Sequence, residues 1–178
     1  MKIALDIGHA NGSDARGIFG ERQISQQLAP MLAARLREAG HEVQVLDFPT
    51  LTNRADLSAT IAAINAGNFD LSVSLHCDDA DSPAARGAHV IYYSLKGYTA
   101  AIEVADRLCL LMPGRAEKTV RRRLDVLRKT NCTAILIELG FTDNSVDAAK
   151  LTDPRYLARV ADAISEGLEV YCDNMPPG

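Results

Sequence analysis

The chain has 178 residues, of which 47% are hydrophobic, 24% are charged and 5% are aromatic, and its formal net charge is −4. This length and apolar fraction predict one domain with a sizeable buried core and exclude a disordered chain. No run approaches the roughly 20 apolar residues that cross a membrane, and the acidic balance, with an isoelectric point of about 5.5, argues against nucleic acid as a partner.

Runs of strand-forming residues alternate along the chain with segments in which apolar residues recur at helical spacing. Strands are predicted, in chain order, at residues 2–7, 43–47, 70–75, 88–93 and 134–138, with a weaker candidate at 124–127. The helical spacing predicts helices over 24–36, 57–64 and 102–112. Two further helices are marked by their starts, because Asn144 can cap one and Asp153-Pro154 supplies a cap followed by a proline for the other.

This alternation of strands and helices favours right-handed crossovers and a mainly parallel sheet. We expect a single-domain α/β fold, a three-layer sandwich whose twisted sheet of about six strands carries helices on both faces. Only about a dozen residues separate Leu75 from Ala88, too few for a crossover helix, so an antiparallel strand is expected there. Residues 1–173 are assigned to this domain and residues 174–178 to a C-terminal tail.

Residues at the points where the predicted strands stop are the candidates for chemistry, because ligands of parallel α/β sheets collect beyond the carboxyl ends of the strands. His9 follows the first strand, His76 follows the third and Glu138 ends a late one. Glu21 opens the first helix. The four side chains are therefore expected at one edge of the sheet.

Two histidines and two carboxylates match the ligands of a catalytic zinc ion, which takes three protein ligands and keeps a fourth position open. Glu21 lies at the positive end of a helix dipole and is assigned as a ligand with His9 and His76. Glu138 follows an apolar strand, where a carboxyl tends toward a raised pKa, and is assigned as the general base. The predicted reaction is hydrolysis of an amide or ester.

Each of these residues also has an ordinary structural interpretation, as a hydrogen-bonded strand-end histidine or a helix-dipole partner. His41 and His89 are interpreted as non-catalytic, and Cys77 as pointing away from His76. Asp6 either orients a ligand from behind or is a plain hydrogen-bonding loop residue. The four cysteines are widely spaced, which predicts reduced thiols.

With these residues in place, the chain resembles the zinc-dependent N-acetylmuramoyl-L-alanine amidases, specifically the type 3 amidase catalytic domain. The resemblance implies that His9, Glu21 and His76 bind Zn²⁺ and that Glu138 is the catalytic glutamate. The chain departs from the family at Ala10-Asn11, where many members carry Gly-Gly, and at residues 77–79, where many carry Asn-Ala. The matching stretches follow the family's order and span residues 3–9 with 20–21, 71–76, 125–131 and 134–144.

The resemblance implies hydrolysis of the amide between the lactyl group of N-acetylmuramic acid and the L-alanine of the stem peptide. The expected partner is peptidoglycan or its muropeptides, bound by a monomer that neither binds nucleic acid nor inserts into a membrane. Arg128 and Asn131 are expected to contact the substrate, whereas residues 121–123 form either a second set of contacts or a solvated basic loop.

Two alternatives stay open at this point: a zinc hydrolase of another peptide or amide, and a non-catalytic relative that binds cell-wall fragments. The chain begins directly with a strand pattern that leaves no room for a signal peptide. We therefore expect a protein that is cytoplasmic as synthesised and acts on the wall after release or export.

Overall fold

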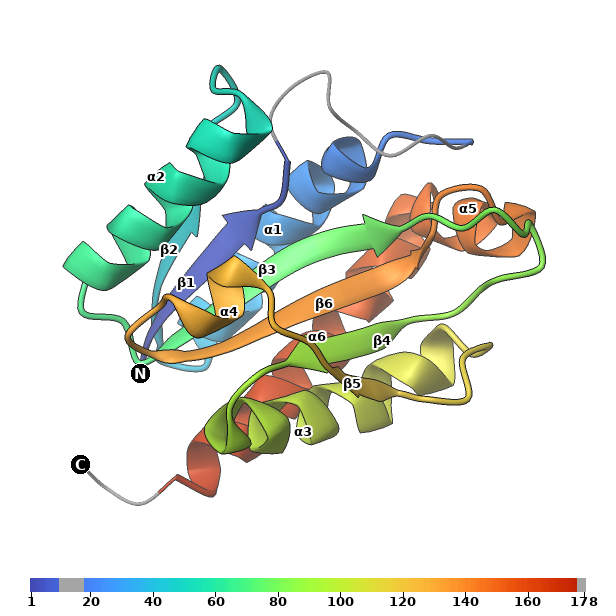
Figure 1. Ribbon diagram of the computed structural model, residues 1–178. Helices are drawn as coiled ribbons and strands as arrows, with labels where there is room; N and C mark the ends of the chain where they lie inside the picture. Colours follow the sequence, from blue (N-terminus) through green and yellow to red (C-terminus); the bar gives the residue numbers. More distant parts are fainter. Residues whose placement is uncertain (10–17, 176–178) are drawn as a thin grey trace.

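The computed structural model describes residues 1–9 and 18–175, which build a six-stranded twisted sheet covered by helices (Figure 1). The strand order is β2-β1-β3-β6-β4-β5. Every neighbouring pair is parallel apart from β4 and β6, which run antiparallel. The strands are β1 (Lys2–Ile7), β2 (Glu42–Leu46), β3 (Leu71–Asp78), β4 (His89–Tyr92), β5 (Thr119–Arg121) and β6 (Thr133–Phe141).

Two helices begin where the sequence marks their starts, whereas the helices predicted from residues 57 and 102 begin earlier, at Asn53 and Leu95. Asn144 accepts hydrogen bonds from the backbone amides of Val146 and Asp147, and Asp153 accepts one from the amide of Arg155, so both predicted caps are confirmed. No described helix is both long and apolar enough to cross a membrane. The helices are α1 (Glu21–Glu38), α2 (Asn53–Ala66), α3 (Leu95–Leu111), α4 (Asp125–Arg128), α5 (Ser145–Leu151) and α6 (Pro154–Asp173).

Alternate residues of the central strands face opposite sides of the sheet, and each side packs against helices, which makes the fold a three-layer sandwich. The larger core joins one face of the sheet to α1, α3 and α6, with Leu5, Leu75 and Ile137 at its centre. The opposite face packs against α2 through Ile64 and against α4 through Leu127. The predicted fold class and the antiparallel strand before α3 are therefore confirmed.

The weak strand predicted at 124–127 is wrong, because these residues lead into the short helix α4. Val126 and Leu127 are buried, as a strand would also require, but the charges around them favour a helical turn. Asp125 lies 2.8 Å from Arg128 and 2.6 Å from Lys129, in i,i+3 and i,i+4 pairs. The sixth strand is instead β5, a three-residue edge strand that the sequence pattern did not indicate.

Candidate metal centre

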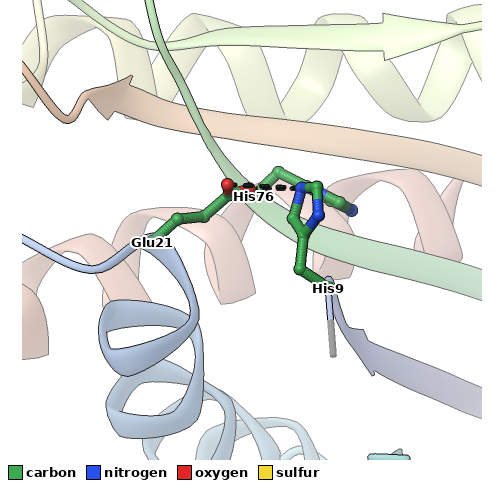
Figure 2. A group of neighbouring side chains, drawn as sticks. All are labelled: His9, Glu21 and His76. Atoms are coloured by element: carbon green, nitrogen blue, oxygen red, sulfur yellow. Dashed lines mark hydrogen bonds and ion pairs between the residues drawn. The ribbon is translucent and has the colours of Figure 1, made fainter. Parts of the chain in front are cut away.

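Three side chains from distant parts of the chain meet at the carboxyl end of the sheet (Figure 2). His9 follows β1, Glu21 is the first residue of α1 and His76 lies in β3. Glu21 Oε1 is 2.9 Å from His76 Nδ1, and Glu21 Oε2 is 3.3 Å from His9 Nε2. The two imidazoles meet edge-on with ring centroids 5.0 Å apart. The structure thus brings together the three residues assigned as ligands.

The cluster fits a zinc ion in both chemistry and dimensions. One ligand atom from each residue can be chosen so that all three lie within 4.8 Å of one another. Tetrahedral zinc with bonds of about 2.0–2.2 Å separates its ligand atoms by roughly 3.3–3.5 Å, so small side-chain shifts suffice. Glu21 is buried, whereas the His9 side chain is 33% exposed. One side of the cluster is therefore open for a fourth ligand.

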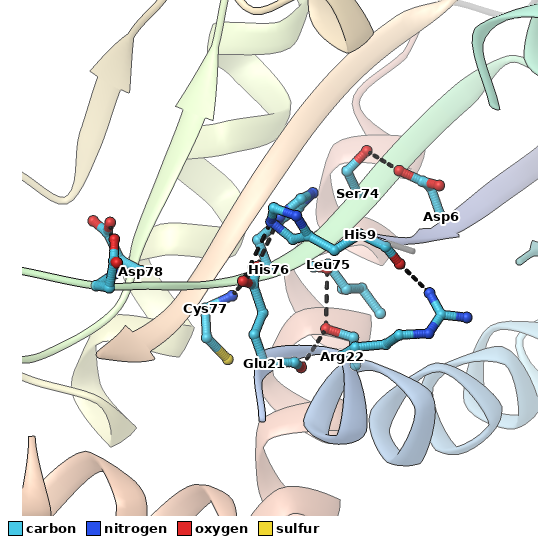
Figure 3. Close-up of polar contacts among 11 residues, drawn as sticks. Asp6, His9, Glu21, Arg22, Ser74, Leu75, His76, Cys77 and Asp78 are labelled. Atoms are coloured by element: carbon cyan, nitrogen blue, oxygen red, sulfur yellow. Dashed lines mark hydrogen bonds and ion pairs between the residues drawn. The ribbon is translucent and has the colours of Figure 1, made fainter. Parts of the chain in front are cut away.

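The backbone at His9 adopts a left-handed conformation, with φ of 61°, which is uncommon for a residue other than glycine. Arg22 stabilises it, because its guanidinium donates a hydrogen bond to the His9 carbonyl (Figure 3). The same guanidinium donates another hydrogen bond to Asp47. Arg22 is almost fully buried. Its position directly after Glu21 means that the start of α1 fixes two of the three ligands.

Strand β3 is fixed to the same helix start. Glu21 Oε1 also accepts a hydrogen bond from the Cys77 amide at 3.0 Å, and Ser25 donates to the Leu75 carbonyl at 3.0 Å (Figure 3). The Cys77 side chain belongs to the larger core, as predicted for a residue facing away from His76. A bulge follows His76 in the pairing of β3 with β6, an irregularity that is common beside functional sites.

Gly8 is required by the position of the His76 ring. A Cβ atom at residue 8 would lie 2.2 Å from Cε1 of His76 and 2.4 Å from its Nε2. The imidazole therefore rests directly on the backbone that precedes His9. Only glycine leaves that space open.

The Glu21 carboxylate and the two imidazoles polarise each other. Burial alone would raise the pKa of Glu21, but hydrogen bonds from His76 and His9 outweigh it and lower this pKa to about 2. Burial alone would lower the pKa of His76, but the Glu21 hydrogen bond and the nearby Glu138 raise it to about 9. The Glu21 carboxylate is thus negative and faces a protonated His76 ring, whose proton a metal cation can replace.

Glu138 stands beside this cluster, directly opposite His76 in the parallel pairing of β3 and β6. Side chains opposite each other in a sheet share a face, so the carboxyl group flanks the imidazole. Burial raises the pKa of Glu138 to about 7 against the attraction of His76. Its Oε2 atom is buried and has no hydrogen-bond partner in the described part of the chain. These are properties of a carboxyl group that can exchange a proton near neutral pH.

Glu138, His9 and His76 line one cavity of about 360 Å³ between α2 and α4. Its walls are mixed: Leu57 and Val126 supply apolar surface, and charged groups surround the floor. The remaining lining residues are Asp6, Gly8, Asn53, Asp56, Thr60, Ile91, Arg122, Leu124, Asp125 and Leu136. A cavity of this size, with apolar walls and a few polar groups, is typical of ligand-binding sites.

The two residues predicted to contact substrate are not among those that line this cavity. Arg128 is paired with Asp125. The backbone amide of Asn131 donates to the side-chain oxygen of Asn65 at 2.8 Å. Asn131 lines a different cavity, next to Met1, at the amino ends of the strands. Both residues precede β6, the strand that carries Glu138 near its carboxyl end. They therefore lie at the opposite end of that strand from the site. Arg122, one of the basic residues 121–123, does line the site cavity.

The other histidines and acids divide as follows. His41 lies 3.1 Å from the N-terminal amine and 2.9 Å from Glu169, away from the site cavity. Asp6 is buried and accepts hydrogen bonds from Thr60 at 3.0 Å and Ser74 at 2.8 Å, so its described bonds reach no ligand. Ala10 and Asn11, where the chain departs from the family it resembles, lie outside the described residues.

Sequence reasoning missed three residues that shape the site. Arg22 follows Glu21 and Gly8 precedes His9, so adjacency to a predicted ligand was the available indication. Asp56 in α2 is buried in the cavity wall, and its Oδ1 has no hydrogen-bond partner in the described structure. Nothing in the sequence around Asp56 distinguishes it from an exposed helical acid.

Comparison with known proteins identifies similar chains. A family described as N-acetylmuramoyl-L-alanine amidase matches residues 3–170. The catalytic domain of the CD27L endolysin, which targets Clostridia difficile, is 32% identical over 96% of this chain and 97% of that one, with a TM-score of 0.86. The amidase CwlM of Bacillus licheniformis is 29% identical over 94% of this chain and 67% of its own length. The probable cell wall amidase LytH of Staphylococcus saprophyticus is 28% identical over 95% of this chain, which spans only 57% of that relative.

Proposed function

Because the chain belongs to the N-acetylmuramoyl-L-alanine amidase family, we propose that its imidazole–carboxylate cluster holds a zinc ion and that Glu138 is the general base of the reaction. Family membership makes the chain a peptidoglycan amidase; the cofactor and the roles of individual side chains are the proposal. The observation that carries it is the arrangement of Glu138, a buried carboxyl with a pKa of about 7, opposite His76 at the floor of the same cavity.

A zinc ion in such a site supplies a Lewis acid that polarises a carbonyl group and acidifies water. The chain's own contribution is to orient and to move protons. Glu21 and the two histidines fix the three ligand positions, and the exposed side of His9 leaves the approach from the cavity open. Arg22 keeps His9 in its left-handed conformation throughout.

Glu138 moves the proton that the reaction requires. As the water oxygen bonds to the lactyl carbonyl carbon, the carboxylate takes a proton from that water. The carbon–nitrogen bond to L-alanine then breaks, and Glu138 delivers the proton to the departing nitrogen. The products are a lactyl carboxylic acid, which releases its proton to solvent at neutral pH, and a peptide with a new amino terminus, so atoms and protons balance.

Arg122 takes the substrate-binding role first assigned to Arg128 and Asn131. Its side chain is exposed in the cavity wall. It lies near enough to Glu138 and Asp78 for its positive charge to oppose the rise that burial causes in the pKa of each. The stem peptide carries carboxylates, which a guanidinium binds in a bidentate manner. Arg122 is therefore the proposed contact for a stem-peptide carboxylate.

The experiment combines elemental analysis of the purified protein with a peptidoglycan digest, with and without chelator. About one zinc per chain and release of peptides with new L-alanine amino termini are expected, and chelator should abolish the release. Glu138→Gln should keep zinc and lose activity by about 10³-fold. New amino termini at another residue would favour the alternative amide substrate, and wall binding without cleavage would favour the non-catalytic alternative. A Glu138→Gln variant that loses zinc or keeps full activity would contradict the assigned role.

A further inference from the structure

His89 in β4 is fully buried, and neither of its ring nitrogens has a hydrogen-bond partner in the described part of the chain. A neutral imidazole has one N–H donor and one acceptor nitrogen. Burying such a group without a hydrogen-bond partner costs roughly 1–3 kcal/mol of folding free energy. The Oδ2 atom of Asp78 lies 3.9 Å from His89 Nε2, too far for a hydrogen bond. A buried polar side chain with this deficit needs a reason to be retained.

The residue directly opposite His89 in the antiparallel pairing of β4 and β6 is Glu138. Opposite residues in such a pair share a face of the sheet, with Cβ atoms about 4.5–5.5 Å apart. The same face carries Ile91 and Leu136, which belong to the core beneath α4. Glu138 is therefore flanked by two histidines on the neighbouring strands, His76 on β3 and His89 on β4.

The two unsatisfied groups are complementary. Glu138 Oε2 is a buried acceptor without a partner, and the His89 ring is a buried donor without one. Burial, together with the cations Arg115 and Arg122, lowers the pKa of His89 to about 4, so its ring is neutral at pH 7. A neutral imidazole carries one N–H, which can be given to one of the two facing carboxylates, Glu138 or Asp78.

We propose that His89 is a positioning residue for Glu138: in the working enzyme its ring N–H donates to Glu138 Oε2, directly or through one water, and turns the other carboxylate oxygen toward the cavity. This inference rests on the proposed function, since it assumes that Glu138 is the base. The bond satisfies Glu138 Oε2 and one of the two His89 ring nitrogens, and it fixes the carboxylate without adding a charge. His89 itself does not line the cavity and so does not touch the substrate.

Three variants test the role. His89→Leu removes the donor at similar volume, His89→Gln restores an N–H donor, and His41→Gln is a matched control at a histidine remote from the cavity. A misplaced catalytic group costs on the order of 10²-fold in rate. We therefore expect kcat of His89→Leu to fall roughly 10- to 100-fold with KM within about twofold of wild type and zinc content unchanged. His89→Gln should recover at least about half of that loss on a logarithmic scale, and His41→Gln should match wild type.

A second measurement keeps the inference testable even if His89→Leu fails to fold. In the zinc-loaded wild-type protein, nitrogen NMR of the histidine rings should show His89 neutral, with its N–H proton shifted downfield by a hydrogen bond, and Glu138→Ala should remove that shift. An unchanged shift in Glu138→Ala, or equal kcat losses in His89→Leu and His89→Gln, would overturn the role. If the wild type does not cleave peptidoglycan, the proposed function fails instead, so the two failures are distinguishable.

Discussion

Replacing Gly8 by alanine tests the geometry of the metal centre with one methyl group. The added Cβ would lie 2.2 Å from Cε1 of His76, whereas carbon atoms in contact are about 3.5 Å apart. Something must therefore move by about 1.3 Å. The neighbouring backbone is held, because the Gly8 amide donates to the Leu75 carbonyl at 3.2 Å and Arg22 binds the His9 carbonyl. The His76 ring is the part that can yield.

A shift of this size removes one of three zinc ligands, since a zinc–nitrogen bond is only about 2.0–2.1 Å long. We expect the Kd for zinc to rise at least about 100-fold, which corresponds to about 2.7 kcal/mol of binding free energy. Titration of the metal-free protein with zinc against a competing chelator measures this directly. The loss of activity should be recovered in part by excess zinc.

Gly40→Ala is the matched control for this variant. An alanine Cβ at residue 40 would have nothing within 4 Å, unlike one at residue 8, although Gly40 has a φ of +92°. The substitution there should cost about 1 kcal/mol of folding stability through backbone strain and leave zinc affinity unchanged. If Gly8→Ala folds and binds zinc within about threefold of wild type, the packing of His76 on Gly8 is refuted.

Three further outcomes are expected. Burial raises the pKa of Glu138 to about 7, and a bound cation lowers it, so kcat/KM should rise with pH with an apparent pKa at or below 7. An apparent pKa above 8 would contradict the assignment of Glu138 as the base. Burial raises the pKa of Asp56 from 3.8 to about 6. The folded protein therefore loses stability as the pH rises from about 4 to about 6, because the buried carboxyl group must ionise. Asp56→Asn should then raise the free energy of unfolding above pH 6, and urea titrations should show that the gain vanishes below pH 4. Arg22→Met should lower the free energy of unfolding by about 3 kcal/mol, since it removes the buried guanidinium that binds Asp47 and the His9 carbonyl, and it should weaken zinc binding. Unchanged values in urea and zinc titrations would contradict the role of Arg22.

The residue pattern alone was sufficient for the fold class and for the four central side chains. The alternation of strand and helix periods determines a layered α/β sandwich, and the chemistry-bearing residues fall where predicted strands stop. His9, Glu21, His76 and Glu138 could be assembled on that basis because parallel strands bring their carboxyl ends to one edge. The caps at Asn144 and Asp153 were equally local, since each is satisfied within three residues.

Contacts that depend on register and on the direction of a side chain required the tertiary structure. The motif spacing places Arg128 and Asn131 near the site, yet they lie at the end of α4 and at the amino ends of the strands. His89, interpreted from sequence as a plain strand residue, faces Glu138 only because β4 pairs antiparallel with β6 in that register.

The physical reason is that the side chains of a strand alternate between its faces, so a slip of one residue moves each of them to the other side of the sheet. Local periodicity specifies which residues form strands, but register is decided by the packing of both cores at once. The sequence therefore determined which groups are present at the carboxyl edge, and the assembled sheet decided which of them face one another.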